Sequence, residues 1–393
     1  MNKMIYMDHS ATTPVKKEVL EEMLPYFSEF YGNPSSVYAL SNHSRLAIDK
    51  ARERVAKAIG AKKTEVFFTG GGSEADNWAL KGIAYKNKDK GNHIITTKIE
   101  HHAILHTCEY LEQQGFQVTY LDVDEYGMIS LEELEKAITE KTILISIMFA
   151  NNEIGTIQPV KEIGELAKKH GVLFHTDAVQ AVGSLPIDVK EMNIDLLSMS
   201  AHKLYGPKGV GALYIRQGTK IDPLIAGGAQ EKNKRAGTEN TPGIVGLGKA
   251  IELAYEHLKE NTDYLISLRE RLIKGVQERI PYVRLNGHPE KRLPGNANFC
   301  FQFIEGEALL LSLDMVGIAG SSGSACTSGS LDPSHVLLAI GLPHEIAHGS
   351  LRLSLGTGNT EEEVDYAVEK LVGIVDRLRM MSPLYEKVQG GNK

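Results

Sequence analysis

Two residues that could support catalysis, Asp177 and Lys203, each stand directly after an apolar segment of the sequence. Burying the Asp177 carboxylate behind residues 172–176 is costly unless it is paired, so Asp177 is either a turn cap or the partner of a protonated ring nitrogen. A lysine at the end of a strand is usually a solvated rim residue. Lys203, however, follows Ser200 and His202 in a loop of small residues, which suits a lysine that forms an imine beside a bound phosphate.

A glycine-rich turn opens a predicted helix at Thr69-Gly70-Gly71-Gly72-Ser73-Glu74. Unpaired backbone N–H groups and the helix dipole favour a phosphate at such a helix start. Ser73 is also a good N-cap, so the turn alone is equally compatible with a purely structural helix entry. A non-catalytic nucleotide-binding module is disfavoured, because the turn lacks both the glycine-lysine ending of a phosphate-binding loop and the spaced glycines of a dinucleotide fingerprint.

One of the three cysteines, Cys326, lies in a segment, residues 321–330, that has almost no apolar side chains. A free cysteine is usually a small buried hydrophobe, which suits Cys108 in a predicted helix and Cys300 in a predicted strand. The segment around Cys326 instead predicts a mobile, exposed loop. A thiol on such a loop can move between positions, which a rigid core cysteine cannot do. Its reactivity requires a thiolate, which His101 or another nearby cation would help to generate.

The elements that must position these residues alternate between short apolar runs and segments of helical period. This pattern is typical of βαβ units and a mostly parallel sheet, in which ligands bind beyond the carboxyl ends of the strands. Strands are expected at residues 66–69, 93–97, 118–121, 143–149, 172–176, 196–200 and 210–215. Helices are expected at residues 74–86, 103–113, 131–139, 160–170 and, as a short segment, 189–192.

A long helical stretch through Leu268 and Arg271 leads to a different pattern. Two strands and one amphipathic helix are expected there, at residues 298–303, 350–355 and 362–380. We therefore expect an α/β fold, with a mostly parallel sheet and flanking helices, joined to a smaller α+β domain. With a boundary near Glu260, the large domain comprises residues 14–260, and the small domain comprises residues 1–13 and 261–393.

Composition argues against several classes of function. The 42% hydrophobic and 24% charged residues are typical of a soluble globular protein, and the net charge of −7 disfavours binding to nucleic acid or an anionic membrane. No segment predicts a signal peptide or a transmembrane helix. The 14 histidines scatter apart from the adjacent His101 and His102, so no helical ligand pair and no metal site are expected. The sparse cysteines suit a reducing cytoplasm.

Several long motifs in one order make the chain similar to the cysteine desulfurases of the iron–sulfur assembly and nitrogen-fixation type. These enzymes belong to the class V aminotransferase-like group, which has fold-type I and uses pyridoxal phosphate. The resemblance covers essentially the whole chain. It rests on Tyr6-Met7-Asp8-His9-Ser10-Ala11-Thr12-Thr13, Gly32-Asn33-Pro34-Ser35-Ser36, Ala150-Asn151-Asn152-Glu153-Ile154-Gly155-Thr156, and residues 174–180, 200–209, 235–240 and 321–330.

The resemblance implies pyridoxal 5′-phosphate as the cofactor and a role for each matching residue. Lys203 is expected to form the internal aldimine and Asp177 to pair with the pyridine nitrogen. Gln180 is expected to bind the ring hydroxyl, with Asn152 close by, and His101 to stack on the ring and shuttle protons. The phosphate is expected to contact Gly72, Ser73, Ser200 and His202, and also Thr238 reaching across from the neighbouring subunit of a homodimer.

The same resemblance implies the reaction. L-Cysteine would be converted to L-alanine, and its sulfur would remain on Cys326 as a persulfide for an iron–sulfur scaffold or another acceptor protein. Arg352, which alternates with leucines in a candidate strand, would clamp the substrate carboxylate with help from Asn33, a contact worth roughly 1.5 to 3 kcal/mol. A selenocysteine lyase or another aminotransferase-like enzyme with the same cofactor remains an alternative.

Overall fold

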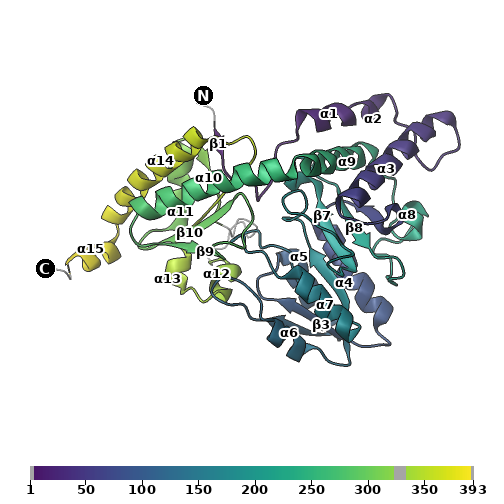
Figure 1. The fold of residues 1–393 in the computed structure, drawn as a ribbon, viewed down its shortest axis with the longest axis horizontal. Coiled ribbons are helices and arrows are strands. Elements are labelled where there is room, and N and C mark those ends of the chain that lie inside the picture. Colours follow the sequence, from purple (N-terminus) through teal and green to yellow (C-terminus); the bar gives the residue numbers. More distant parts are fainter. Residues whose placement is uncertain (1–3, 323–332, 391–393) are drawn as a thin grey trace.

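The computed structural model describes residues 4–322 and 333–390 and is built around a seven-stranded sheet (Figure 1). The strand order is β2-β8-β7-β6-β5-β3-β4. Strand β8 is antiparallel to both β2 and β7, and the other neighbours are parallel, which confirms a mostly parallel sheet. The strands are β2 (Val66–Thr69), β3 (His93–Thr97), β4 (Gln117–Leu121), β5 (Thr142–Ser146), β6 (Leu173–Asp177), β7 (Leu196–Ser200) and β8 (Gly211–Ile215).

Helices cover both faces of this sheet. Because side chains alternate along a strand, Phe67 and Phe68 of β2 point to opposite faces and belong to different apolar clusters. Helices α4 (Gly72–Asn87) and α5 (His102–Gln113) pack on the Phe67 face. The Phe68 face is covered by α1 (Lys17–Met23), α3 (Ala39–Ala58), α7 (Val160–His170) and α9 (Thr241–Glu256). Shorter helices are α2 (Pro25–Ser28), α6 (Leu131–Ala137) and α8 (Gln230–Asn233).

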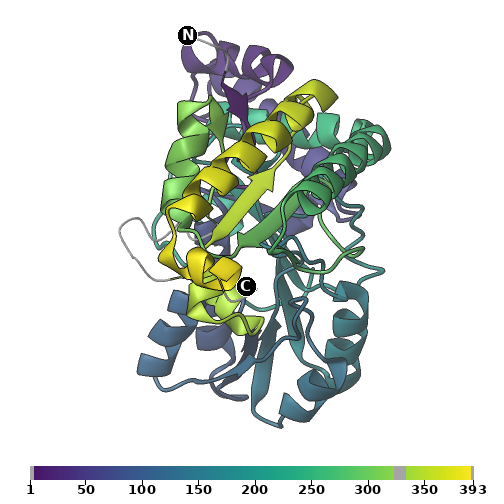
Figure 2. The same ribbon diagram turned by 90° about the vertical axis from the view of Figure 1, so that its left-hand side faces the viewer.

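A smaller α+β unit follows along the chain. Its antiparallel sheet consists of β9 (Val283–Asn286), β10 (Asn296–Phe301) and β12 (Ser350–Ser354). Helices α10 (Leu258–Arg279), α11 (Gly306–Met315) and α14 (Glu361–Met380) contribute to its apolar core, and Figure 2 shows α14 lying across this sheet. The remaining helices are α12 (His335–Ala339), α13 (His344–Ala347) and α15 (Pro383–Gly390).

The N-terminal segment joins the smaller unit. Strand β1 (Ile5–Tyr6) pairs in parallel with β11 (Ile318–Ala319), and Met7 is fully buried in the core of the smaller unit. The chain then crosses to the large sheet, where the Thr13 hydroxyl donates a hydrogen bond to the His202 carbonyl at 2.9 Å. The segment between these points therefore bridges the two units.

Most of the expected elements are present, with small differences at their ends. The expected helix at residues 189–192 is wrong, because this stretch is a turn. The Asp188 carboxylate accepts hydrogen bonds from the Lys190 and Glu191 N–H groups at 2.9 and 3.0 Å, and Asn193 has a positive φ of 52°. Side-chain capping of a turn thus replaces the short helix. No helix in the described part of the chain is long and apolar enough to cross a membrane.

Candidate active site

A cavity of about 300 Å³ lies at the carboxyl ends of β6 and β7 and the start of α4. The turn before α4 and the residues after β6 and β7 meet here because parallel strands end at one edge of the sheet. Ten of the residues predicted from the sequence line this cavity: Gly72, Ser73, His101, Asn152, Asp177, Gln180, Ser200, His202, Lys203 and Arg352.

Three predicted site residues are not among those that line it. Thr238 and Asn33 are both exposed, and the Asn33 Oδ1 accepts a hydrogen bond from the Ser35 N–H at 2.9 Å. Cys326 lies outside the described residues. The single chain therefore places the predicted ring, phosphate and carboxylate contacts together, apart from Thr238 and Asn33.

Asp177, the last residue of β6, is only 7% exposed. Burial raises the pKa of its carboxyl to about 6, although the Val179 N–H at 2.9 Å and the charge of Lys203 act in the opposite direction. A buried carboxyl of this kind gains strongly from a cationic partner. Its place in the cavity therefore suits a protonated ring nitrogen.

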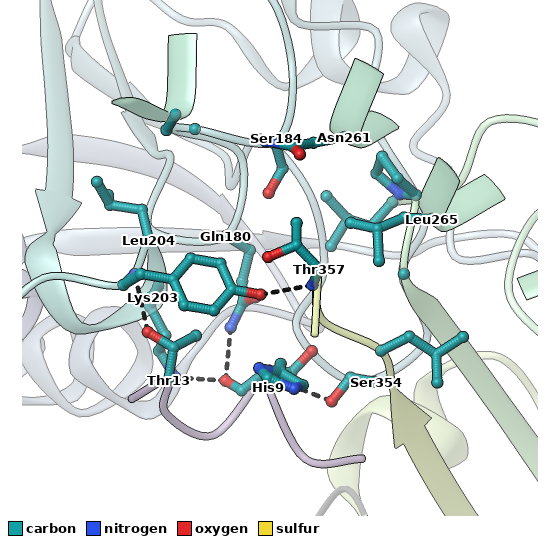
Figure 3. Close-up of a pocket in the computed structure, with 18 of the residues that line it drawn as sticks. His9, Thr13, Gln180, Ser184, Lys203, Leu204, Asn261, Leu265, Ser354 and Thr357 are labelled. Carbon is teal, nitrogen blue, oxygen red and sulfur yellow. Dashed lines mark hydrogen bonds between the residues drawn. The ribbon is translucent and has the colours of Figure 1, made fainter. Parts of the chain in front are cut away.

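The N-terminal segment binds the side chain of Lys203. Its ammonium donates hydrogen bonds to the carbonyl oxygens of Ser10 and Ala11, the latter at 2.7 Å. The Gln180 amide donates to the same Ser10 carbonyl at 2.9 Å (Figure 3). A second cavity, of about 80 Å³, shares Ser10, Gln180 and Lys203 with the first, so these residues form the wall between the two.

His101 caps α5, and this contact defines its tautomer. Its Nδ1 accepts a hydrogen bond from the Ala103 N–H at 3.1 Å, so the proton of the neutral ring is on Nε2. Burial, and then the charge of Lys203, lower the pKa of His101 to about 4. The lowered pKa favours the neutral ring, which offers a proton donor or acceptor, and the expectation that His101 or another nearby cation helps to form a thiolate stays a prediction.

The start of α4 has backbone N–H groups without a side-chain cap. Its N-cap is Gly71, with φ of 152°, so Ser73 is not the cap. A Cβ on Gly72 would lie 2.7 Å from Val179 Cγ2, so this close approach requires glycine. Ser200 at the end of β7 is 3% exposed and faces the same cavity.

His202 completes this end of the cavity. Its Nδ1 lies 3.1 Å from the Thr12 hydroxyl, and burial, with the charges of Lys203 and Lys208, lowers its pKa to about 4. Together with the free helix start, this neutral donor suits a bound phosphate.

Arg352 of β12 is 3% exposed and also lines the cavity. Its Nη2 donates to Asp8 Oδ1 at 2.8 Å, its Nη1 donates to the Asn152 carbonyl at 3.0 Å, and its Nε has no hydrogen-bond partner in the described part of the chain. Sequence reasoning predicted Arg352 but not Asp8. The two are 344 positions apart, and only the pairing of the N-terminal segment with the smaller unit brings them together.

Comparisons with known proteins show the family of this chain. The family model of the class-V aminotransferases matches residues 5–367. The chain belongs to this family. It is 67% identical to "Cysteine desulfurase IscS" of Clostridium botulinum (strain Hall / ATCC 3502 / NCTC 13319 / Type A), over 98% of both proteins.

Two solved structures are also similar. One, named "NIFS-LIKE PROTEIN", has a TM-score of 0.90 and 43% identity and covers 95% of this chain and 100% of its own. Another, "SspA in complex with cysteine", has a TM-score of 0.81 and 41% identity and covers 91% of this chain and 100% of its own. These likenesses support the α/β fold with its mostly parallel sheet.

The class-V aminotransferases are enzymes that depend on pyridoxal phosphate, and the residues of this chain fit that group. The start of α4 has no side-chain cap for its backbone N–H groups, which suits an anion, and Gly72 packs closely against Val179. Lys203 supplies an amine, and Asp177 supplies a buried carboxyl whose pKa the charge of Lys203 lowers. Residues suited to contact the phosphate, the aldehyde and the ring nitrogen of the cofactor therefore line one cavity.

Two buried acids beside this cavity were not predicted from the sequence. Asp76 of α4 is 1% exposed and Glu100 is fully buried. Burial, and then the charge of Asp177, raise the pKa of Asp76, and burial raises the pKa of Glu100 to about 8. A signal for Asp76 existed, because it has helical spacing with the buried residues Leu80 and Ile83.

The expectation that no histidines have helical ligand spacing is wrong. His102 and His106 are four residues apart in α5, with ring centroids 4.9 Å apart, and His335 lies 4.8 Å from His102. Within residues 4–322 and 333–390, however, no group of three or more potential ligands is arranged to hold a metal ion.

The packing predictions for the other two cysteines are confirmed. Cys108 of α5 and Cys300 of β10 are both fully buried and unpaired. Burial raises the pKa of both thiols, to about 11 for Cys300. Neither thiol is therefore suited to act as a nucleophile.

Proposed function

We propose that this protein is a cysteine desulfurase, which converts L-cysteine to L-alanine and keeps the sulfur as a persulfide on Cys326. The observation that carries the proposal is the single cavity that holds Lys203, Asp177, His101 and Arg352. The names of similar proteins support it, since one is a cysteine desulfurase at 67% identity and another was solved in complex with cysteine.

When bound, pyridoxal phosphate serves as an electron sink that stabilises negative charge at the substrate Cα. Lys203 would bind it covalently, and Asp177 would hold a proton at the ring nitrogen. Gln180 would contact the ring hydroxyl, with Asn152 nearby, and His101 would stack on the ring. The phosphate would be held by Gly72, Ser73, Ser200 and His202.

The remaining residues would act on the substrate. Arg352 would bind the α-carboxylate, assisted by Asn33, and the neutral His101 would accept or donate a proton near the reacting atoms. The Cys326 thiolate would attack the substrate sulfur to form the S–S bond of the persulfide, while the carbon–sulfur bond breaks and the carbon takes up a proton before alanine leaves. Ser321, which belongs to the same sequence motif as Cys326, exchanges backbone hydrogen bonds with Arg352 at 3.1 and 2.6 Å, and this supports the assignment of Cys326.

We also propose a homodimer in which Thr238 contacts the phosphate of the neighbouring subunit. Its exposure and its absence from the cavity of its own chain support this role. A group of exposed apolar side chains on the N-terminal helices and the segments that join them offers a surface for a second subunit. Its members are Leu20, Leu24, Phe27, Tyr31, Val37, Tyr38 and Leu46.

We further propose the domain division into residues 14–260 and residues 1–13 with 261–393. Separate apolar cores in the two units, with Met7 in the second, support it. We place the protein in the cytoplasm and propose an iron–sulfur scaffold, or another sulfur-acceptor protein, as its partner. The name of the desulfurase at 67% identity supports the first of these partners.

The deciding experiment combines an absorption spectrum with product analysis. The purified protein, incubated with pyridoxal phosphate, should show a visible band and should form alanine from cysteine. Cys326→Ser should keep the band and the spectral response to cysteine but should form neither alanine nor sulfide.

Cys108→Ser and Cys300→Ser are matched controls, because both thiols are buried in apolar cores, and both variants should turn over cysteine at near-normal rates. Absence of a visible band would reject the proposal. If Cys326→Ser formed alanine and one of the control variants did not, the persulfide would have to be assigned to a cysteine other than Cys326. Faster alanine release from selenocysteine than from cysteine would favour a selenocysteine lyase.

A further inference from the structure

The guanidinium of Arg352 already has a negatively charged partner from its own chain. Its Nη2 donates to Asp8 Oδ1 at 2.8 Å, and the side chains of Arg352 and Asp8 are only 4% and 18% exposed. Among the residues that the structure describes, none accepts a hydrogen bond from the buried Arg352 Nε. The salt bridge therefore uses the Nη2 side of the guanidinium and leaves the Nε–H group for another acceptor.

A buried guanidinium without a counter-charge would be costly, so Asp8 stabilises Arg352 when no ligand is bound. A ligand carboxylate at Arg352 would be a second anion on the same cation. The other acid that interacts with Arg352 is Glu153, which accepts a hydrogen bond from the Ser334 hydroxyl and whose pKa burial raises to about 7. Asp8 is thus the carboxylate in direct contact with the guanidinium.

The backbone at Asp8 is fixed independently of its side chain. The Asp8 carbonyl accepts hydrogen bonds from the Tyr6 hydroxyl and the Ala11 N–H, both at 3.0 Å. The His9 and Ser10 N–H groups donate to Ser354 at 3.1 and 2.8 Å. Removal of the Asp8 charge should therefore leave the path of this segment unchanged.

We propose that Asp8 is a specificity-determining residue that competes with the substrate carboxylate for Arg352. It occupies the guanidinium in the absence of substrate and weakens the binding of every ligand that carries an α-carboxylate. The inference rests on the proposed function for the nature of the substrate. Asp8 thereby sets the affinity for cysteine. When alanine leaves, the Asp8–Arg352 contact forms again, and this favours the release of alanine.

The test compares ligands with and without a carboxylate on the cofactor-loaded protein. In Asp8→Asn, which keeps an acceptor oxygen but removes the charge, the KM for L-cysteine should fall by about tenfold, as expected for like charges in a partly buried site. The concentration of L-alanine that gives half of the spectral change should fall in parallel. For cysteamine, which is cysteine without its carboxylate, that concentration should stay unchanged.

One further variant serves as the matched control. Asp122→Asn removes a charge from an exposed ion pair with Lys98 and should leave the KM for L-cysteine unchanged. An unchanged or higher KM in Asp8→Asn would overturn the proposal, because Asp8 would then only orient Arg352. An equal effect on cysteamine would also overturn it. Failure of the proposed function is distinct, since it would remove the visible band or the turnover of the wild-type protein.

Discussion

The buried carboxyl of Glu100 should make the stability of the protein depend on pH between about pH 6.5 and 8.5. Its Oε1 accepts hydrogen bonds from the Thr97 hydroxyl at 2.7 Å and the Met148 N–H at 3.0 Å, and its Oε2 has no partner. Burial raises its pKa to about 8 in the folded state, against roughly 4.3 in the unfolded chain. The folded protein therefore holds a proton that the unfolded chain releases.

The direction and the size of this change in the free energy of unfolding follow from proton linkage. Because the folded pKa is raised, the stabilising contribution is complete below about pH 4 and is lost as the pH rises through about 8. Between pH 6.5 and 8.5, this single group should lower the free energy of unfolding by about 2 kcal/mol. Glu153, with a pKa raised to about 7, adds to the fall.

Buried histidines act in the opposite direction, but at lower pH. Burial lowers the pKa of His175 to about 3, and His101 and His202 have values of about 4. Their stabilising contributions are complete above the unfolded pKa of about 6.5 and are lost as the pH falls toward the folded values. They are also the same in wild type and in a Glu100 variant, so they cancel in a comparison.

Glu100→Gln removes the titrating proton and keeps an acceptor for Thr97 and Met148. Urea unfolding of the cofactor-free protein at pH 6.5 and 8.5 should show a fall in stability that is about 2 kcal/mol smaller than in wild type. Glu109→Gln, on an exposed face of α5, is the matched control and should behave as wild type. The reasoning is refuted if Glu100→Gln and wild type lose the same free energy between the two pH values.

Three substitutions test other parts of the site and fold. Lys203→Ala should abolish the visible band of the covalently bound cofactor, and a normal spectrum would reject its assignment. Arg352→Ala should raise the KM for cysteine by roughly 10- to 100-fold with less change in cofactor content, as steady-state kinetics and cofactor titration will measure. Glu231→Ala breaks a buried pair with Arg52 at 2.6 Å and should destabilise the protein by about 3–5 kcal/mol in urea unfolding.

The sequence predicted the large sheet well because its strands are buried on both faces. Such strands are continuous apolar runs, and β7 was predicted with both of its ends correct. Asp177 and Lys203 were identified for the same reason, since each polar residue stands at or just beyond the end of an apolar run. In residues 189–192, by contrast, the Asp188 side chain bonds to the backbone and favours a turn, which periodicity does not reveal.

Contacts between distant segments were beyond the reach of sequence patterns. The charge state of His101 depends on its burial and on Lys203, which is far away along the chain. The ion pair of Asp8 with Arg352 depends on strand β1 lying beside β11. Local spacing reports which face of an element is buried, but it does not report which charge lies opposite.

The N-terminal segment shows how such contacts combine into one device. Asp8 contacts the proposed carboxylate clamp, while the Ser10 and Ala11 carbonyls hold the ammonium of Lys203. The segment from Asp8 to Ala11 thus connects Arg352 with Lys203. Arg352 is expected to bind the substrate carboxylate, and the Lys203 amine is expected to be freed when the substrate amine replaces it. Because Met7 is buried in the core of the smaller unit, a shift of that unit would change the contacts with both Arg352 and Lys203. The segment is therefore part of the site's chemistry as well as a link between two cores.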